Sequence, residues 1–387
     1  MDIQPLGPAW DRALTAEELA RRAAAEPAFA PELPEPERTA RGCALYALTP
    51  LARAAVEGGA GLTRLRGSVC ALGAFDGVHL GHRMLAEKTV REARELGLPA
   101  VAVTFDPDPA DVLAGRERFS MLLPVVDRLR LLVSLGLDAL LVVPFTRELA
   151  ATGHREFLEG WLVPELGCRS LHVGSNFRMG SGGAGTVEAL TAEAAELGVS
   201  VRGHELLARE GEVVSATRIR ALVRAGEVGR AAELLGRDHC VRGRVVHGRG
   251  EGTSFGFPTA NLSCDERSCL PGEGVYAALA SVDGTAWPAA VNVGAPRTFG
   301  GEEGRAFLEP TLLGFSGDLY GRELEVSFVA WLREPRKFPS FEVLKATVLG
   351  NVEWVRRFMG ESPIAPEVPV VPEAGHRAGS PVSGGRA

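Results

Sequence analysis

The octapeptide Phe75-Asp76-Gly77-Val78-His79-Leu80-Gly81-His82 lies between an apolar run at residues 69–73 and a helix-like stretch at residues 84–96. This order predicts a strand, a tight glycine-containing turn and a helix. His79 and His82 would then lie at the N-terminal end of the helix, where backbone N–H groups and the helix dipole favour an anion. We therefore predict a phosphate-binding turn, in preference to a glycine turn that carries two solvated histidines.

Apolar runs alternate with helix-like patterns from residue 67 to about residue 207. The predicted strands are residues 69–73, 100–105, 139–144, 170–174 and 200–205, and the intervening helices are residues 85–96, 125–135 and 154–166. Nearly continuous apolar strands that alternate with helices indicate a parallel sheet covered on both faces. Ligands of such sheets bind beyond the carboxyl ends of the strands, which is where the histidine-containing turn lies. The fold class expected for residues 67–225 is an α/β, Rossmann-like domain.

A different pattern begins near residue 241. Short alternating runs, separated by glycine and proline, occur at residues 242–247, 274–282, 287–293 and 323–332. They indicate a small antiparallel β-barrel or sandwich. Residues 341–358 have the amphipathic spacing of a closing helix. We therefore expect a second domain, an antiparallel β-barrel, over residues 226–358.

Both ends of the chain are expected to lie outside these two domains. Four prolines between residues 25 and 41 indicate a linker, so residues 1–66 are predicted to form a linker-like N-terminal extension. Within it, Thr15 as N-cap and Glu18 at N3 predict a short helix over residues 15–24. Residues 359–387 are rich in Pro, Gly, Ser and Ala, a composition that predicts a disordered tail.

The composition argues against several classes of partner. The 387 residues include 42 basic and 49 acidic side chains, for a net charge of −7, so a nucleic-acid partner gains no support. The six cysteines form no Cys-x-x-Cys pair, and neither a zinc site nor a disulfide framework is indicated. No apolar run approaches the ~20 residues that span a bilayer, and the N-terminus lacks a signal-peptide pattern. We expect a soluble, cytoplasmic protein without a membrane partner, and find no sequence signal for an oligomeric state.

Three further segments of the first domain carry side chains suited to phosphate. Residues 105–109 (FDPDP) and 173–180 (VGSNFRMG) each end a predicted strand at the ligand edge, and residues 214–220 (VSATRIR) open a predicted helix. Hydroxyl and guanidinium groups at a helix N-terminus suit a triphosphate. Alone, such a Ser/Thr segment is more often an N-cap followed by a solvated arginine. Its occurrence together with the histidine-containing turn favours a phosphate site.

Together these motifs resemble those of the bacterial bifunctional riboflavin kinase/FMN adenylyltransferase (FAD synthetase) family. The match runs in register from about residue 69 to about residue 355. Its first half is similar to the adenylyltransferase module, one of the His-x-Gly-His nucleotidyltransferases, and its second half to the riboflavin kinase module, a small β-barrel. The matching segments of the second half are Gly256-Phe257-Pro258-Thr259-Ala260-Asn261, Gly274-Val275-Tyr276, Asn292-Val293-Gly294, Leu308-Glu309, Asp318-Leu319-Tyr320-Gly321, and Leu332-Arg333 with Lys337-Phe338.

The resemblance implies that the first domain transfers an adenylyl group from ATP to FMN, which yields FAD and pyrophosphate. His79 and His82 would be the catalytic residues, holding the ATP phosphates while the FMN phosphate attacks the α-phosphorus directly. Because no protein nucleophile is needed, positioning and charge stabilisation must supply the catalysis. The residues expected to bind ATP or its phosphates in this domain are Phe75, Gly77, Asn176, Ser215, Thr217 and Arg220.

For the second domain, the resemblance implies phosphorylation of the ribityl 5′-hydroxyl of riboflavin by ATP. It assigns Glu309 to the general base, a role that a carboxylate within hydrogen-bond reach of the attacking hydroxyl can fill. Thr259 and Asn261 would bind Mg²⁺, the expected cofactor, and ATP is the co-substrate. The other residues assigned to ligands in this domain are Gly256 and Pro258 for ATP and Asn292 and Arg333 for the flavin. The expected partners are thus riboflavin, FMN and ATP.

The sequence departs from the family pattern at several positions. Ala74 stands where the family usually has Asn, Asp108 where it usually has His, and Ala216 where it has a second serine. A carboxylate at position 108 would repel phosphate. Three hypotheses therefore stay open: an enzyme with both activities, a riboflavin kinase with an inactive adenylyltransferase domain, and a non-catalytic flavin- or nucleotide-binding regulator. The presence of Glu309 disfavours the regulator, since a pure binding protein needs no general base.

Overall fold

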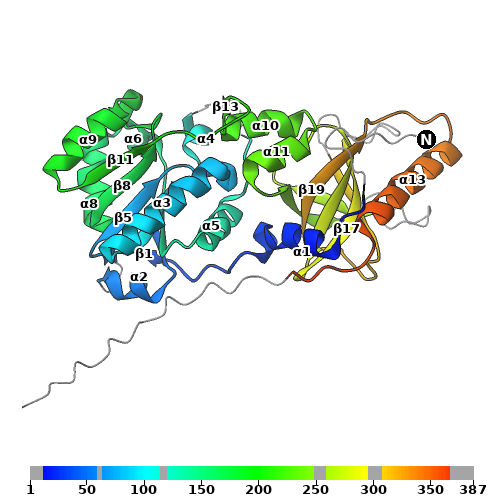
Figure 1. The fold of residues 1–387 in the computed structure, drawn as a ribbon, viewed down its shortest axis with the longest axis horizontal. Coiled ribbons are helices and arrows are strands. Elements are labelled where there is room, and N and C mark those ends of the chain that lie inside the picture. The colour runs from blue at the N-terminus through cyan, green and yellow to red at the C-terminus, as the bar shows by residue number, and fades with distance from the viewer. Residues whose placement is uncertain (1–11, 59–62, 114–119, 248–258, 295–306, 367–387) are drawn as a thin grey trace, which may run out of the picture.

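The computed structural model describes residues 12–58, 63–113, 120–247, 259–294 and 307–366 (Figure 1). Within them the chain forms an α/β domain followed by a closed β-barrel. Helices α10 (Ala216–Arg224) and α11 (Val228–Leu235) lie between the two. This architecture confirms the fold class predicted from the sequence.

The α/β domain is built on a sheet with the strand order β1-β2-β7-β6-β5-β8-β11. The predicted strands are all present, as β5 (Ser68–Leu72), β6 (Ala100–Phe105), β7 (Ala139–Val143), β8 (Cys168–Gly174) and β11 (Ser200–His204). They run parallel, so their carboxyl ends share one edge of the sheet. Every residue of β5, β6 and β7 is buried, as expected for strands covered on both faces.

Alternate residues of β5 enter two different cores, because successive side chains of a strand point to opposite faces. Val69 and Ala71 pack with α3 (Leu80–Leu96) and α5 (Val125–Ser134) on one face. Cys70 and Leu72 pack on the other face with the predicted helix near residue 160 and with α9 (Val187–Glu196). That predicted helix consists of α7 (His154–Phe157), a π-helical turn η3 (Leu158–Leu162) and α8 (Val163–Leu166). The shorter elements are α2 (Pro50–Ala55), β3 (Val56–Glu57), β4 (Arg64–Leu65), η2 (Asp76–Val78), α4 (Pro109–Leu113), α6 (Arg147–Ala151), β9 (Arg178–Met179), η4 (Ser181–Gly183), β10 (Gly185–Thr186), β12 (Ala208–Arg209) and β13 (Glu212–Val213).

The N-terminal residues are more structured than the linker-like extension predicted for residues 1–66. Helix α1 (Ala16–Ala24) has the predicted capping box of Thr15 and Glu18, and Leu19 and Ala23 pack on the outside of the barrel. After the 3-10 turn η1 (Pro27–Phe29), strands β1 (Glu37–Arg38) and β2 (Ala44–Ala47) join the main sheet, with β2 antiparallel to β7. The sheet of the first domain therefore begins well before residue 67.

The second domain is a closed antiparallel barrel with the strand order β14-β15-β18-β17-β16-β19. Its strands are β14 (His239–Val246), β15 (Asn261–Cys264), β16 (Gly274–Val282), β17 (Thr285–Gly294), β18 (Phe307–Leu312) and β19 (Glu323–Arg333). Tyr276 and Phe328 are among the side chains that fill its interior. The predicted closing helix, α13 (Phe341–Met359), packs outside the barrel with α1. Beyond it Ile364 forms a bridge to Ala286, and residues 367–387 of the predicted disordered tail lie outside the described residues.

Paired charges join the two domains to each other and to α1. Arg242 of β14 lies 2.6 Å from a carboxylate oxygen of Asp127 in α5 and 2.9 Å from one of Glu325 in β19. Arg22 of α1 pairs at 2.5 Å with Asp238, in the link between α11 and β14. Asp127, Glu325 and Asp238 are buried, and burial of such charges is tolerated only when each has a partner.

Candidate active sites

The histidine-containing turn connects β5 to α3 in an uncommon backbone conformation. Phe75, Gly77 and Val78 have φ values of 55°, 76° and 43°, in the region that favours glycine. A Cβ at Gly77 would lie 2.7 Å from Leu122 Cδ1, so close packing also requires a residue without a side chain. Gly77, which was assigned to phosphate, thus shapes the turn and lies outside the wall of the cavity beside it.

Asp76 anchors this turn to neighbouring segments. Its buried carboxylate accepts hydrogen bonds from Leu122 N at 3.0 Å and Leu123 N at 3.2 Å, and pairs with Arg220 Nη2 at 2.7 Å. Arg220 also donates from Nε to Ser120 O at 2.7 Å. The carboxylate therefore holds Arg220 against the histidine-containing turn. Sequence reasoning assigned no role to Asp76, and its place inside the octapeptide was the only signal.

His79 and His82 are stacked at the start of α3, with 3.6 Å between their ring centroids. His79 is the N-cap, and its Nδ1 accepts a hydrogen bond from His82 N at 3.4 Å. Burial lowers the pKa of His79 to about 4 and also lowers the pKa of His82, because the charged form loses solvation. Neutral His79 therefore carries its proton on Nε2, from which it can be donated to a phosphate oxygen.

A cavity of about 470 Å³ opens at the carboxyl ends of the parallel strands. The predicted site residues that line it are Phe75, His79 and His82 from the turn, Asn176 after β8, and Ser215, Thr217 and Arg220 at the start of α10. Asp108 and His204 line it as well, and sequence reasoning missed a role for His204. Three segments far apart in the sequence thus converge on one cavity, whose mainly apolar wall carries a few polar side chains, as is typical of a nucleotide-binding site.

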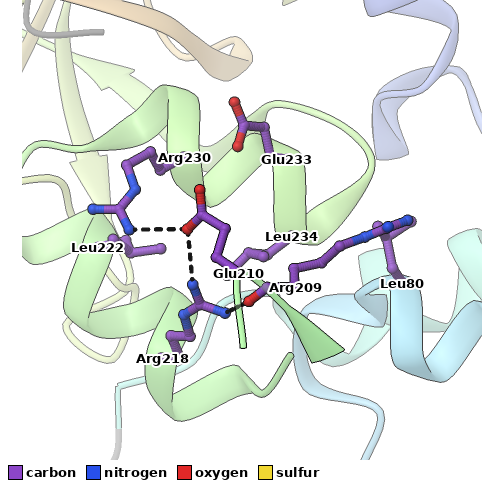
Figure 2. A pocket seen from close by; sticks show the side chains of 8 residues that line it. All are labelled: Leu80, Arg209, Glu210, Arg218, Leu222, Arg230, Glu233 and Leu234. Carbon is purple, nitrogen blue, oxygen red and sulfur yellow. Dashed lines mark hydrogen bonds and ion pairs between the residues drawn. The ribbon is translucent and has the colours of Figure 1, made fainter. Parts of the chain in front are cut away.

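The two arginines of the VSATRIR segment point to different places. Ser215 caps α10 by accepting a hydrogen bond from Arg218 N at 3.3 Å. Arg220 lines the cavity, whereas the Arg218 side chain pairs with Glu210 at 3.3 Å. Figure 2 shows Arg218 and Arg230 on either side of Glu210 in a second cavity of about 300 Å³. Because carboxylates already pair with these two arginines, the second cavity is poorly suited to an anion.

A buried arginine compensates for the departure at Asp108. Arg128 of α5 donates from Nη1 to Ala74 O at 2.7 Å and from Nη2 to Phe105 O at 2.7 Å. Its Nη1 also lies 3.4 Å from Asp108 Oδ2, and Asp108 accepts a hydrogen bond from Ala110 N at 2.9 Å. Burial raises the pKa of Asp108, and the charge of Arg128 opposes that shift. Two of the three departures from the family pattern, Ala74 through its backbone carbonyl and Asp108 through its carboxylate, therefore meet at one guanidinium group.

Four of the predicted kinase residues lie together on neighbouring barrel strands. Asn292 of β17 is in register with Glu309 of β18, and its Nδ2 donates to Glu309 Oε2 at 3.2 Å. The antiparallel pairing of β15 with β18 brings Asn261 next to Glu309, and Thr259 precedes that strand. The barrel thus gathers the predicted base, one flavin residue and both predicted magnesium ligands along one part of its wall.

Arg333 lies at the end of β19, where it contacts α13. Its Nε donates to Asn351 Oδ1 at 3.3 Å, and its guanidinium carbon lies 5.6 Å from the centre of the Phe338 ring. Burial lowers the pKa of Arg333 to about 10. Arg333 and Asn292 both pair with Val275 in register, so they share one face of the barrel, as a common ligand requires. The other two assigned residues of this domain, Gly256 and Pro258, lie outside the described residues.

The kinase residues fit a magnesium ion bound together with substrate phosphates. Thr259 and Asn261 offer a hydroxyl and an amide oxygen, and Mg²⁺ prefers oxygen ligands and retains several waters. Within the described ranges, no group of three or more His, Cys, Asp or Glu side chains could hold a metal ion. A site completed by ATP phosphates needs no such group.

Known proteins share this two-part organisation. A family model described as FAD synthetase matches residues 62–218, and one described as riboflavin kinase matches residues 235–359. The bifunctional riboflavin kinase/FMN adenylyltransferase of Pseudomonas fluorescens is 34% identical over 297 residues, which cover 77% of this chain and 94% of that protein. Those of Escherichia coli K12 and Bacillus subtilis are 34% and 31% identical over 295 and 280 residues, which cover 76% and 72% of this chain and 93% and 88% of those proteins.

A solved structure described as a macrolide-efflux protein from Streptococcus pneumoniae superposes with a TM-score of 0.68 at 30% identity, covering 75% of this chain and 94% of that one. None of the helices within the described residues is long and apolar enough to cross a membrane.

A nucleotidyltransferase-like domain joined to a flavokinase barrel defines a two-domain transferase of flavin cofactor synthesis. The chain belongs to the bacterial family of bifunctional riboflavin kinase/FMN adenylyltransferases.

Proposed function

We propose that this chain converts riboflavin to FMN in the barrel, residues 226–358, and FMN to FAD in the α/β domain, residues 67–225. The observation that carries the adenylyl-transfer half is the single cavity in which His79, His82 and the start of α10 converge. The kinase half rests on Glu309 beside Asn261 and Asn292 on adjacent strands. ATP and riboflavin are substrates available in the cytoplasm, and the cysteines are free thiols, so we place the protein there.

In adenylyl transfer, a phosphate oxygen of FMN attacks the α-phosphorus of ATP. The new P–O bond forms as the bond from the α-phosphorus to the bridging oxygen breaks, and pyrophosphate leaves with that electron pair. His79 Nε2–H donates to a phosphate oxygen, and Arg220 lends positive charge at the cavity wall. Since no side chain is a nucleophile, the protein contributes alignment and charge stabilisation. Mg²⁺ bound with ATP would supply additional charge neutralisation.

In the kinase reaction, the ribityl 5′-oxygen attacks the γ-phosphorus of ATP, and ADP leaves. The Glu309 carboxylate accepts the proton of that hydroxyl as the O–P bond forms, and the hydrogen bond from Asn292 Nδ2 orients the carboxylate. Thr259 and Asn261 would hold the Mg²⁺ that accompanies ATP. Asn292 and Arg333, on the same face of the barrel, would contact the flavin.

A riboflavin kinase with an inactive first domain is the second candidate. It is favoured by Asp108, a carboxylate on the wall of a cavity that must receive phosphates. Against it, Arg128 already pairs with Asp108, so the excess negative charge at the wall is small. The set of His79, His82 and Arg220 is also in place.

The deciding experiment is chromatography of products from purified protein with Mg²⁺, once with riboflavin and ATP and once with FMN and ATP. We expect FMN and FAD from the first mixture and FAD from the second. FMN alone would establish the kinase-only candidate. Neither product would support the third hypothesis, a flavin- or nucleotide-binding regulator.

A further inference from the structure

A chain of titratable side chains lies beside the first cavity and does not belong to its phosphate-binding set. Lys88 Nζ of α3 lies 3.2 Å from His204 Nδ1 at the end of β11. His204 Nε2 lies 2.9 Å from His172 Nδ1 of β8, and the two rings are stacked with centroids 5.0 Å apart. His172 Nε2 in turn lies 2.9 Å from Glu92 Oε2, back on α3. The chain thus begins and ends on the same helix.

The Lys88 end determines the direction of the two hydrogen bonds in this chain. The Lys88 ammonium can only donate, so His204 Nδ1 accepts and His204 carries its proton on Nε2. His204 Nε2–H then donates to His172 Nδ1, which leaves the second proton on His172 Nε2. His172 Nε2 lies 2.9 Å from Glu92 Oε2 but outside hydrogen-bond geometry, so the last link is an electrostatic contact with the carboxylate.

Both imidazoles are therefore neutral. Burial, assisted by the Lys88 charge, lowers the pKa of His204 to about 4, and burial lowers the pKa of His172. The other charged groups near the chain are Arg202, whose Nε lies 3.6 Å from Glu92 Oε2, and Glu205 at the cavity wall. A proton added to His204 Nδ1 would meet the Lys88 ammonium, so the neutral arrangement is the stable one.

The elements that this chain joins each supply residues to the lining of the cavity. Helix α3 begins with the two phosphate-binding histidines, whereas β8 and β11 continue into Asn176 and into residues 204–207. The backbone adds one link between the two strands, from Ser175 N to His204 O at 2.7 Å. A shift of α3 relative to these strand ends would move His79 and His82 relative to Asn176 and residues 204–207, which line the same cavity.

We infer that His204 is a positioning residue for adenylyl transfer, which fixes α3, through Lys88 and Glu92, relative to the ends of β8 and β11 and thereby fixes the two histidines at the start of that helix. The inference rests on the proposed adenylyl transfer from ATP to FMN. Misplacement of reacting groups by about 1 Å can lower a rate by about 10²-fold. For loss of one link in the chain we expect kcat of FAD formation to fall about tenfold, with KM for ATP and FMN changed less than about threefold.

Two substitutions of His204 and one matched control test this inference. His204→Phe keeps a ring but removes both hydrogen bonds, and should show the full loss of kcat. His204→Gln keeps an amide that can donate to His172, and should recover at least half of the lost rate. Arg91→Met changes an exposed side chain on the same turn of α3 and should leave kcat unchanged. Riboflavin phosphorylation by the same molecules reports whether each variant is folded.

The tautomers of His204 and His172 can be measured directly, and a mere loss of stability would not change them. Histidine-ring ¹⁵N NMR of the wild type should show the Nε2–H form for His204 and His172. Lys88→Met removes the ammonium and should raise the pKa of His204 by about one pH unit. Wild-type kcat in His204→Phe, an equal loss of both activities, or an Nδ1–H His204 would overturn the inference. Absence of FAD formation by the wild type would instead refute the proposed function.

Discussion

The two candidate active sites differ in how their polar side chains are held. In the α/β domain, Asp76, His79 and Asp108 are only 4%, 6% and 8% exposed, and each has a hydrogen-bond partner within the protein. On the barrel, Glu309 is half-buried and Asn292 is exposed, and one hydrogen bond joins them. In the first site the side chains proposed for catalysis therefore also contribute to folding, whereas in the second the proposed catalytic side chains are separable from folding. The following predictions test that difference.

Glu309→Ala should give the largest effect on a single activity. Loss of a general base lowers a rate about 10²–10⁴-fold, so FMN formation should fall by that factor. FAD formation from supplied FMN and the unfolding temperature should stay at wild-type values, because among the described residues Glu309 makes one side-chain hydrogen bond, at a partly exposed position. Steady-state kinetics with each substrate checks this, with Glu361→Ala on the surface as the control. Phosphorylation at near wild-type rate would remove Glu309 from the mechanism.

Asp76→Ala should impair both stability and activity of the first domain. It leaves Arg220 without its buried partner and two backbone N–H groups without their acceptor, and breaking a buried ion pair costs about 3–5 kcal/mol. Urea unfolding should show this loss, and FAD formation should fall far more than FMN formation. Asp111→Ala, at a less buried carboxylate of the same domain, is the control. An unchanged unfolding midpoint would contradict the anchoring role of Asp76.

His79 should make the free energy of unfolding depend on pH. Its pKa is about 4 in the folded protein and about 6.5 when unfolded, so the unfolded state binds more protons below pH 6.5. The stability from neutral His79 is complete above that pH and is lost as the pH falls toward 4. For a shift of this size, linkage gives a loss of about 2 kcal/mol between pH 7 and pH 5.

His79→Gln, which cannot titrate in this range, should reduce that loss. Urea unfolding of the wild type and the variant at the two pH values measures the difference. Arg91→Met, at an exposed side chain that does not titrate in this pH range, should behave like the wild type. Parallel pH dependence in the wild type and His79→Gln would show that His79 is not the titrating group.

Asp108→Asn should give the smallest effect. It removes a negative charge from the cavity wall but keeps a polar group beside Arg128. A carboxylate that is already paired with a cation should weaken the binding of a nearby phosphate by only about 0.5–1 kcal/mol. Removal of its charge should therefore lower the KM for ATP in FAD formation about threefold. Substrate-dependent kinetics checks this, with riboflavin phosphorylation as the internal control. A rise in KM would mean that Asp108 assists nucleotide binding.

The sequence predicted the long strands and helices of both domains better than the short elements at the margins of the sheets. Long apolar strands such as Ala100–Phe105 and the turn ending in His82 carry strong local patterns, and all five parallel strands were found. Strands Glu37–Arg38 and Ala44–Ala47 were missed because two to four residues carry no usable period. Ala44–Ala47 is a strand because β7 offers it an edge with which to pair, and Glu37–Arg38 in turn pairs with Ala44–Ala47.

In the candidate sites, the sequence identified which residue types are present, and the structure showed which contacts each of them makes. Ser215 and Gly77 were predicted to bind phosphate, and the structure adds that Ser215 caps α10 and that Gly77 shapes the turn. Arg128 and His204 carried no signal at all, because their partners lie on other elements.

By itself, therefore, the sequence determined the succession of strands and helices, the positions of the chemical groups at strand ends, and membership in a family. These follow from local periodicity and from motifs contained in a few adjacent residues. Only the tertiary structure decided that Arg128 joins Ala74 to Asp108, and that Lys88 and Glu92 hold two histidines between them. Such contacts join residues far apart in the chain, and their strength depends on burial, which the packed fold alone creates.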